Sequence, residues 1–124
     1  MFANIKDKFK NFHDKPFRQF QEEAVSFIQE STKPIVVIQA PTGSGKSLIG
    51  MVAGAAVGEF TYLVSSKQLQ SQLHHDYPEV EVMKGRNNFN CLWRPGHTCD
   101  DCINSQITRC PHKAMVLMRC RKNV

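Results

Sequence analysis

The chain carries the octapeptide Ala40-Pro41-Thr42-Gly43-Ser44-Gly45-Lys46-Ser47. It follows the phosphate-binding pattern G-x-x-x-x-G-K-[ST], with Ala40 at the first glycine position. The apolar, β-branched run 34–39 precedes it and predicts a buried strand. The apolar run 47–57, rich in small residues, follows it and predicts a buried helix. Strand, glycine loop and helix in this order predict a P-loop.

Each part of this loop has an expected chemical role. Gly43 and Gly45 let the backbone curl so that successive N–H groups face phosphate oxygens. Lys46 is expected to reach the β- and γ-phosphates of ATP, and the Ser47 hydroxyl to bind the accompanying Mg²⁺, so these two are the candidate catalytic residues. The other candidate phosphate-contacting residues of the loop are Pro41, Thr42, Ser44 and Leu48.

Helical and strand-like patterns surround the loop. Residues 17–30 predict an amphipathic helix, and Ser65-Ser66 predict the capped start of a helix over 67–73. The apolar run 61–64 predicts a second strand, and residues 79–83, with Val80 and Val82 on one face, predict a third. Successive strands separated by a helix are parallel. The expected fold class is therefore α/β, with a partial RecA-like P-loop NTPase domain built on parallel strands.

The sequence changes character near residue 84, beyond which Asn, Arg, Gly, Pro and Cys dominate. Two domains are therefore expected: a partial ATP-binding domain over residues 1–83, and a small irregular cysteine module over residues 84–124. The 16 Lys and Arg residues against 11 Asp and Glu give a net charge of +5, which mildly favours a polyanionic partner. No apolar run approaches the length of about 18 residues that spans a bilayer, and no signal peptide is evident, so a cytoplasmic location is expected.

Five cysteines all lie in the last 34 residues of the 124-residue chain. Four of them have the spacing Cys91-x7-Cys99-x2-Cys102-x7-Cys110, and Cys120 is left as a spare. An odd number of cysteines in a cytoplasmic chain favours metal ligands over a disulfide framework. The single C-x-x-C pair favours an iron–sulfur cluster over zinc, which prefers two such pairs, but the spacing leaves both open. His97 and His112 are alternative zinc ligands.

Several segments together resemble the iron–sulfur DNA helicases of superfamily two, the XPD/DinG type. In chain order they are Phe17-Arg18-Gln19-Phe20-Gln21, the P-loop, Tyr62-Leu63-Val64-Ser65-Ser66, Lys84-Gly85-Arg86-Asn87-Asn88-Phe89-Asn90-Cys91, and Cys110-Pro111. The resemblance covers residues 17–114, and its most specific part is the string that ends at Cys91.

The resemblance implies a parent activity of ATP-dependent DNA unwinding. Cys91, Cys99, Cys102 and Cys110 would ligate a [4Fe–4S] cluster in a module that guides single-stranded or forked DNA. Gln21 would lie on the adenine side of bound ATP. In a helicase of this type the chain would act in the cytoplasm at the nucleoid, or in the nucleus of a eukaryotic cell.

The chain departs from the family pattern in two respects that concern activity: it lacks the acidic pair that ATP hydrolysis needs, and it lacks the second motor domain that translocation needs. ATP hydrolysis needs an acidic pair at the end of an apolar strand, and Asp100-Asp101 instead lies inside the C-x-x-C loop. We therefore expect the amino-terminal part of a helicase that does not hydrolyse ATP on its own. The alternatives are a non-helicase P-loop ATPase with a zinc module, and a zinc-containing nucleic-acid-binding module.

Overall fold

The computed structural model describes residues 1–101 and Cys110. It contains two compact units, one over residues 1–80 and a second that starts at Glu81. The domain boundary expected from the sequence lay between residues 83 and 84, and the roles expected for the two domains stay predictions. None of the helices in the described part of the chain has the length and apolar character needed to cross a bilayer.

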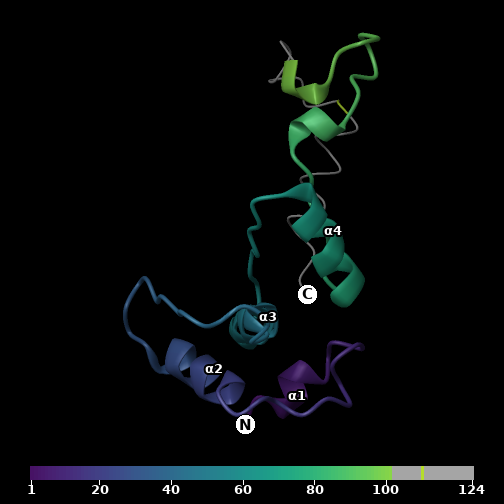
Figure 1. Cartoon of the computed structure of the whole chain (residues 1–124). Coiled ribbons are helices and arrows are strands. Elements are labelled where there is room, and N and C mark those ends of the chain that lie inside the picture. The colour runs from purple at the N-terminus through teal and green to yellow at the C-terminus, as the bar shows by residue number, and fades with distance from the viewer. Residues whose placement is uncertain (102–109, 111–124) are drawn as a thin grey trace. The chain divides into compact units, whose positions relative to one another are not determined.

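The regular structure of the first unit consists of α-helices (Figure 1). They are α1 (Ala3–Lys6), α2 (Gln21–Glu30), α3 (Lys46–Val57) and α4 (Lys67–Asp76). The helices expected over residues 47–57 and 67–73 are confirmed as α3 and α4. The helix expected from residue 17 begins four residues later, as α2, because the Gln21 side chain accepts a hydrogen bond from the Arg18 N–H and holds the preceding residues in a turn.

Local capping explains the ends of α4. The Ser66 hydroxyl accepts a hydrogen bond of 3.2 Å from the Leu69 N–H and so pairs an amide that the helix leaves unpaired. At the other end, the Tyr77 N–H donates to Leu73 O at 2.7 Å. The helix therefore begins where its Ser-Ser signal predicts.

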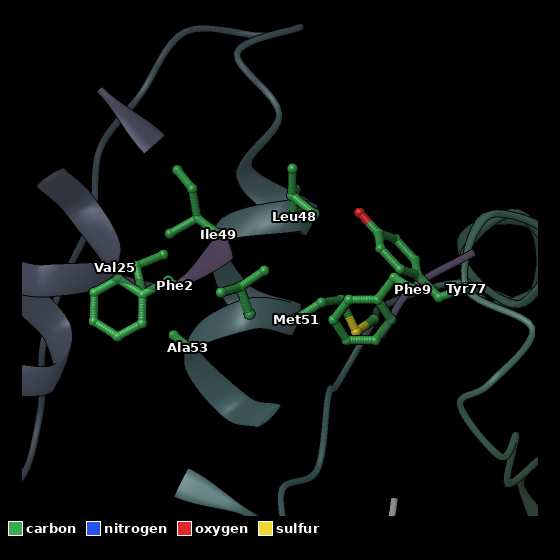
Figure 2. Close-up of a cluster of buried hydrophobic side chains, with 9 residues drawn as sticks. Phe2, Phe9, Val25, Leu48, Ile49, Met51, Ala53 and Tyr77 are labelled. Carbon is green, nitrogen blue, oxygen red and sulfur yellow. The ribbon is translucent and has the colours of Figure 1, made fainter. Parts of the chain in front are cut away.

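The hydrophobic core of the first unit is built around α3. Figure 2 shows Phe2 and Val25 on one side of this helix and Phe9 and Tyr77 on the other. The buried apolar residues are Phe2, Phe9, Val25, Leu48, Ile49, Met51, Val52, Ala53 and Tyr77. Both α1 and α2 pack against α3, so the apolar helix that follows the glycine loop organises the whole unit.

Two glycines of α3 allow the chain that follows the helix to fold back closely onto it. A Cβ atom on Gly50 would lie 2.7 Å from the Tyr62 ring, and one on Gly54 would lie 2.5 Å from the Phe60 ring. Real side chains essentially never approach so closely. The small-residue character of α3 therefore serves the packing of residues 60–62.

The amino-terminal segment attaches to the end of α4 through aromatic rings and one amide. The Tyr77 ring stacks on Phe12, with centroids 4.8 Å apart, and meets Phe9 edge-on at 5.4 Å. The Asn11 amide donates to the carbonyl oxygens of His75 and Asp76 at 3.2 and 2.9 Å. Burial also raises the pKa of the Tyr77 phenol.

The expected α/β fold with parallel strands is wrong for the described residues, whose regular elements are all helices and which contain no strand or sheet. The runs 34–39, 61–64 and 79–83 do not form strands. In the first two runs alternate residues are half-buried, but Ile35, Val37 and Leu63 are 78, 82 and 86% exposed. An apolar β-branched run becomes a strand only when a neighbouring strand takes up its backbone hydrogen bonds, and the described residues supply no such neighbour to 34–39 or 61–64.

The described part of the second unit has short turns in place of long elements. Its described part contains the 3₁₀-helices η1 (Arg86–Asn88) and η2 (Cys99–Asp101), which lie against each other. A single antiparallel bridge joins Asn90 to Thr98. This agrees with the irregular character that the sequence predicts beyond residue 84.

Candidate functional site

The backbone of residues 40–47, here called the phosphate loop, turns at two glycines. Gly43 and Gly45 have φ angles of 79° and 83°, in the left-handed region that glycine adopts without strain. Gly45 is also the N-cap residue of α3, so the loop runs directly into the positive end of that helix. The left-handed positions fall where the motif predicts them.

Side chains take up the carbonyl oxygens of the phosphate loop. Lys46 Nζ donates to Ala40 O at 2.8 Å and to Pro41 O at 2.9 Å. Gln21 Nε2 donates to Ser44 O at 3.2 Å and to Gly45 O at 3.4 Å. Arg18 Nη1 donates to Gly43 O. Three side chains therefore neutralise the negative ends of the loop's peptide dipoles.

The N–H groups of the loop are left for another acceptor. Those of Gly43, Gly45, Lys46 and Ser47 have no hydrogen-bond partner within residues 1–101, whereas the Ser44 N–H donates to Pro41 O. Consecutive unpaired N–H groups at the start of a helix form a favourable environment for an anion. The loop therefore exposes N–H donors while side chains bond to its carbonyl oxygens, an arrangement that favours binding of phosphate.

Ser44 is a second unsatisfied group in the loop. The residue is only 7% exposed, and its buried hydroxyl oxygen has no hydrogen-bond partner in the described part of the chain. A buried polar group without a partner costs about 1–3 kcal/mol. A ligand that pairs with this hydroxyl would recover that cost.

The other residues predicted for the loop differ in their exposure. Pro41, Thr42 and Lys46 are exposed and Ser47 is half-buried, so a ligand can reach them. Leu48 is buried in the core around α3, and its N–H donates to Gly45 O at 3.1 Å. Leu48 therefore anchors the loop rather than lining it.

Gln21 and Arg18 both lie on the phosphate loop. Gln21 was expected on the adenine side, which stays a prediction; its carboxamide lies against Ser44 and Gly45. Arg18 received no role from the sequence. Its position three residues before Gln21, across the turn that precedes α2, is the signal that could have indicated it.

Three of the four predicted cluster ligands, Cys91, Cys99 and Cys110, lie among the described residues. The Cys91 N–H donates to His97 O at 2.8 Å, and the Cys99 N–H donates to Phe89 O at 2.7 Å. With Asn90 paired to Thr98, this register places Cys91, His97 and Cys99 on one face of the bridge, because side chains alternate along paired segments. Cys91, Cys99 and Cys110 are half-buried, and Cys102, His112 and Cys120 lie outside the described residues.

Arg86 of η1 contacts Asp100 of η2, and His97 contacts Asp101. Arg86 Nη2 donates to Asp100 O at 3.2 Å, and Arg86 Nε lies 3.9 Å from Asp100 Oδ1. His97 Nδ1 lies 3.8 Å from Asp101 Oδ2. No group of three ligating side chains that could hold a metal ion comes together among the described residues.

Comparison with known proteins adds no relative. No family model, no curated protein and no solved structure matches the chain.

Proposed function

We propose that the phosphate loop binds the phosphates of a Mg²⁺-bound nucleoside triphosphate, ATP in the parent activity. The observation that carries this proposal is the division of the loop's polar groups. Side chains occupy its carbonyl oxygens, and the N–H groups of Gly43, Gly45, Lys46 and Ser47 are left unpaired at the start of α3.

The chemistry of the loop assigns a role to each polar group. Lys46 exchanges the carbonyl oxygens of Ala40 and Pro41 for the β- and γ-phosphates when nucleotide binds. The Ser47 hydroxyl is a ligand for Mg²⁺, and the unpaired backbone amides of Gly43, Gly45, Lys46 and Ser47 hold phosphate oxygens. The buried Ser44 hydroxyl gains a partner.

The larger activity in this proposal is ATP-dependent DNA unwinding, with the chain as the ATP-binding part of a DNA helicase. It rests on the segments quoted from residues 17 to 114, and the net charge of +5 suits a DNA partner. Single-stranded or forked DNA in the cytoplasm or nucleus is the expected substrate. Because no acidic pair follows an apolar run, the chain itself is proposed to bind ATP without turnover.

In the cysteine module, Cys91, Cys99, Cys102 and Cys110 are proposed to hold a [4Fe–4S] cluster. Thiolates are the ligands that such clusters require, and the bridge places two of the four on one face. When bound, the cluster would act as a rigid structural centre beside the DNA path.

Zinc is the second candidate for this module, in a nucleic-acid-binding role. His97 shares the face that carries Cys91 and Cys99, and mixed histidine and cysteine ligand sets are typical of zinc.

Binding of Mg-ATP to the purified chain, measured by calorimetry, tests the phosphate-loop proposal. Lys46→Ala removes a charged donor to the phosphates and is expected to weaken binding by about tenfold or more. Lys33→Ala is the matched control, because Lys33 is exposed and its side chain makes no hydrogen bond. Equal affinities of the two variants would contradict the proposal, and turnover that depends on Lys46 would contradict the absence of hydrolysis.

A further inference from the structure

Gln21 is a buried polar residue whose surroundings differ from those of a base-reading side chain. It is the first residue of α2, and α2 packs on α3 beside the loop (Figure 1). Only 3% of the residue is exposed to solvent. Its carboxamide must therefore find its partners inside the protein.

Both the NH₂ group and the oxygen of the Gln21 carboxamide form hydrogen bonds within the protein. A glutamine amide has two N–H donors and one carbonyl oxygen. The donors contact Ser44 O at 3.2 Å and Gly45 O at 3.4 Å, and the oxygen accepts the Arg18 N–H at 2.9 Å. These partners also fix the orientation of the amide, because the reversed orientation would place its oxygen against two carbonyl oxygens.

Recognition of adenine needs the same groups. A glutamine reads adenine with its oxygen and its NH₂ group together, one accepting and one donating. Gln21 would have to release both loop carbonyls and leave its buried position to do so. The loop conformation that presents N–H groups to phosphate would then lose its support at Ser44 and Gly45.

The fit between Gln21 and Gly45 supports a bracing role. A Cβ atom on Gly45 would lie 2.3 Å from Gln21 Nε2, so the amide nitrogen packs where a side chain at position 45 would start. Glycine is thus required at this position both for its positive φ and for the approach of Gln21.

We infer that Gln21 positions the phosphate loop and does not read the nucleotide base, so that the site selects the triphosphate group with little regard to the base. The inference rests on the proposed function and specifies the substrate class of the same site: Mg²⁺ complexes of nucleoside triphosphates in general. It departs from the adenine-side role expected for Gln21.

The first test compares three probes on the wild-type full chain by calorimetry: Mg-ATP, Mg-GTP and Mg-tripolyphosphate. ATP and GTP are expected to bind within about threefold of each other, because the bidentate contact that would discriminate adenine by about tenfold or more is not available. Tripolyphosphate is expected to compete with both nucleotides. A preference for ATP over GTP of about tenfold or more would overturn the inference while leaving the phosphate-loop proposal intact.

The second test uses a readout that does not depend on a ligand. Gln21→Ala is expected to speed amide hydrogen exchange at Ser44 and Leu48, whose N–H groups donate to Pro41 O and Gly45 O, and Gln19→Ala, at an exposed neighbouring position, is expected to leave it unchanged. Gln21→Ala is also expected to weaken the binding of all three probes by the same factor. Unchanged exchange in Gln21→Ala, or a loss confined to ATP, would overturn the bracing role.

The two tests separate the possible failures. Absence of binding by every probe would refute the proposed function, and the exchange measurement would still decide whether Gln21 braces the loop. The comparison of probes on the wild-type chain needs no variant, so a poorly folding Gln21→Ala protein does not prevent a decision.

Discussion

The ammonium group of Lys6 is enclosed by oxygen atoms. Its Nζ lies 2.8 Å from Phe12 O, 2.9 Å from His13 O and 3.0 Å from Asp7 Oδ1. The residue is only 4% exposed. A buried ammonium is tolerated when its protons are hydrogen-bonded, so Lys6 ties the turn that contains Phe12 and His13 to α1.

Lys6→Met is expected to destabilise the protein by about 2–3 kcal/mol, because it keeps the apolar stem but leaves two carbonyl oxygens without their charged donor. Urea unfolding measures the change. Lys8→Met is the control, since Lys8 is exposed and loses the same charge. Equal midpoints for the two variants would show that the contacts of Lys6 contribute nothing to stability.

Local sequence predicts the roles of some residues at the phosphate loop and not of others. The sequence predicts that the backbone curls at Gly43 and Gly45, and both have positive φ angles, which glycine adopts without strain. The hydrogen-bond partners of Gln21 could not be predicted from local sequence. Residues 44 and 45 are more than twenty positions away from it and meet it only when α2 packs on α3.

At the scale of elements, α3 combines a helix start that faces the loop with a surface shaped by Gly50 and Gly54. The rings of Tyr62 and Phe60 lie over these glycines. Glycine lowers helix propensity by about 1 kcal/mol relative to alanine, so its presence twice in one helix needs a compensating contact. The close approach of the two rings supplies that contact.

Gly54→Ala is expected to destabilise the protein, because the new Cβ would lie 2.5 Å from the Phe60 ring. In a Phe60→Ala background the same substitution is expected to stabilise by about 1 kcal/mol through helix propensity alone. Thermal or urea unfolding of the four proteins gives the coupling free energy. A Gly54→Ala effect that has the same sign in both backgrounds would contradict the proposed contact.

At the scale of the whole molecule, the chain consists of two compact units with different kinds of support. The first unit has an apolar core around α3. The described part of the second unit has two 3₁₀-helices, one bridge and exposed ion pairs, and it contributes no residue to that core. Exposed ion pairs contribute little to stability, so the metal centre proposed for this unit would add support that these described contacts do not supply.

Protein purified without oxygen is expected to contain iron and sulfide, with about four irons per chain. Cys91→Ser is expected to lose the metal because it removes a proposed ligand, and Cys120→Ser, the spare cysteine, is expected to keep it. Elemental analysis together with the visible absorption spectrum measures both. Zinc without iron would favour the nucleic-acid-binding alternative, and absence of both metals would refute the module as a metal centre.

Local sequence sufficed for the glycine turns, for α3 and for the capped start of α4, since backbone preference, apolar periodicity and a serine cap act over a few residues. It did not suffice for the fold class. The runs 34–39 and 61–64 have the composition of strands, but a strand exists only where another segment accepts its hydrogen bonds, and the described residues form no backbone hydrogen bond with either run. The same reason separates the two parts of the candidate site: the phosphate loop is a local motif, whereas its bracing by Arg18 and Gln21 arises from contacts between segments distant in the chain.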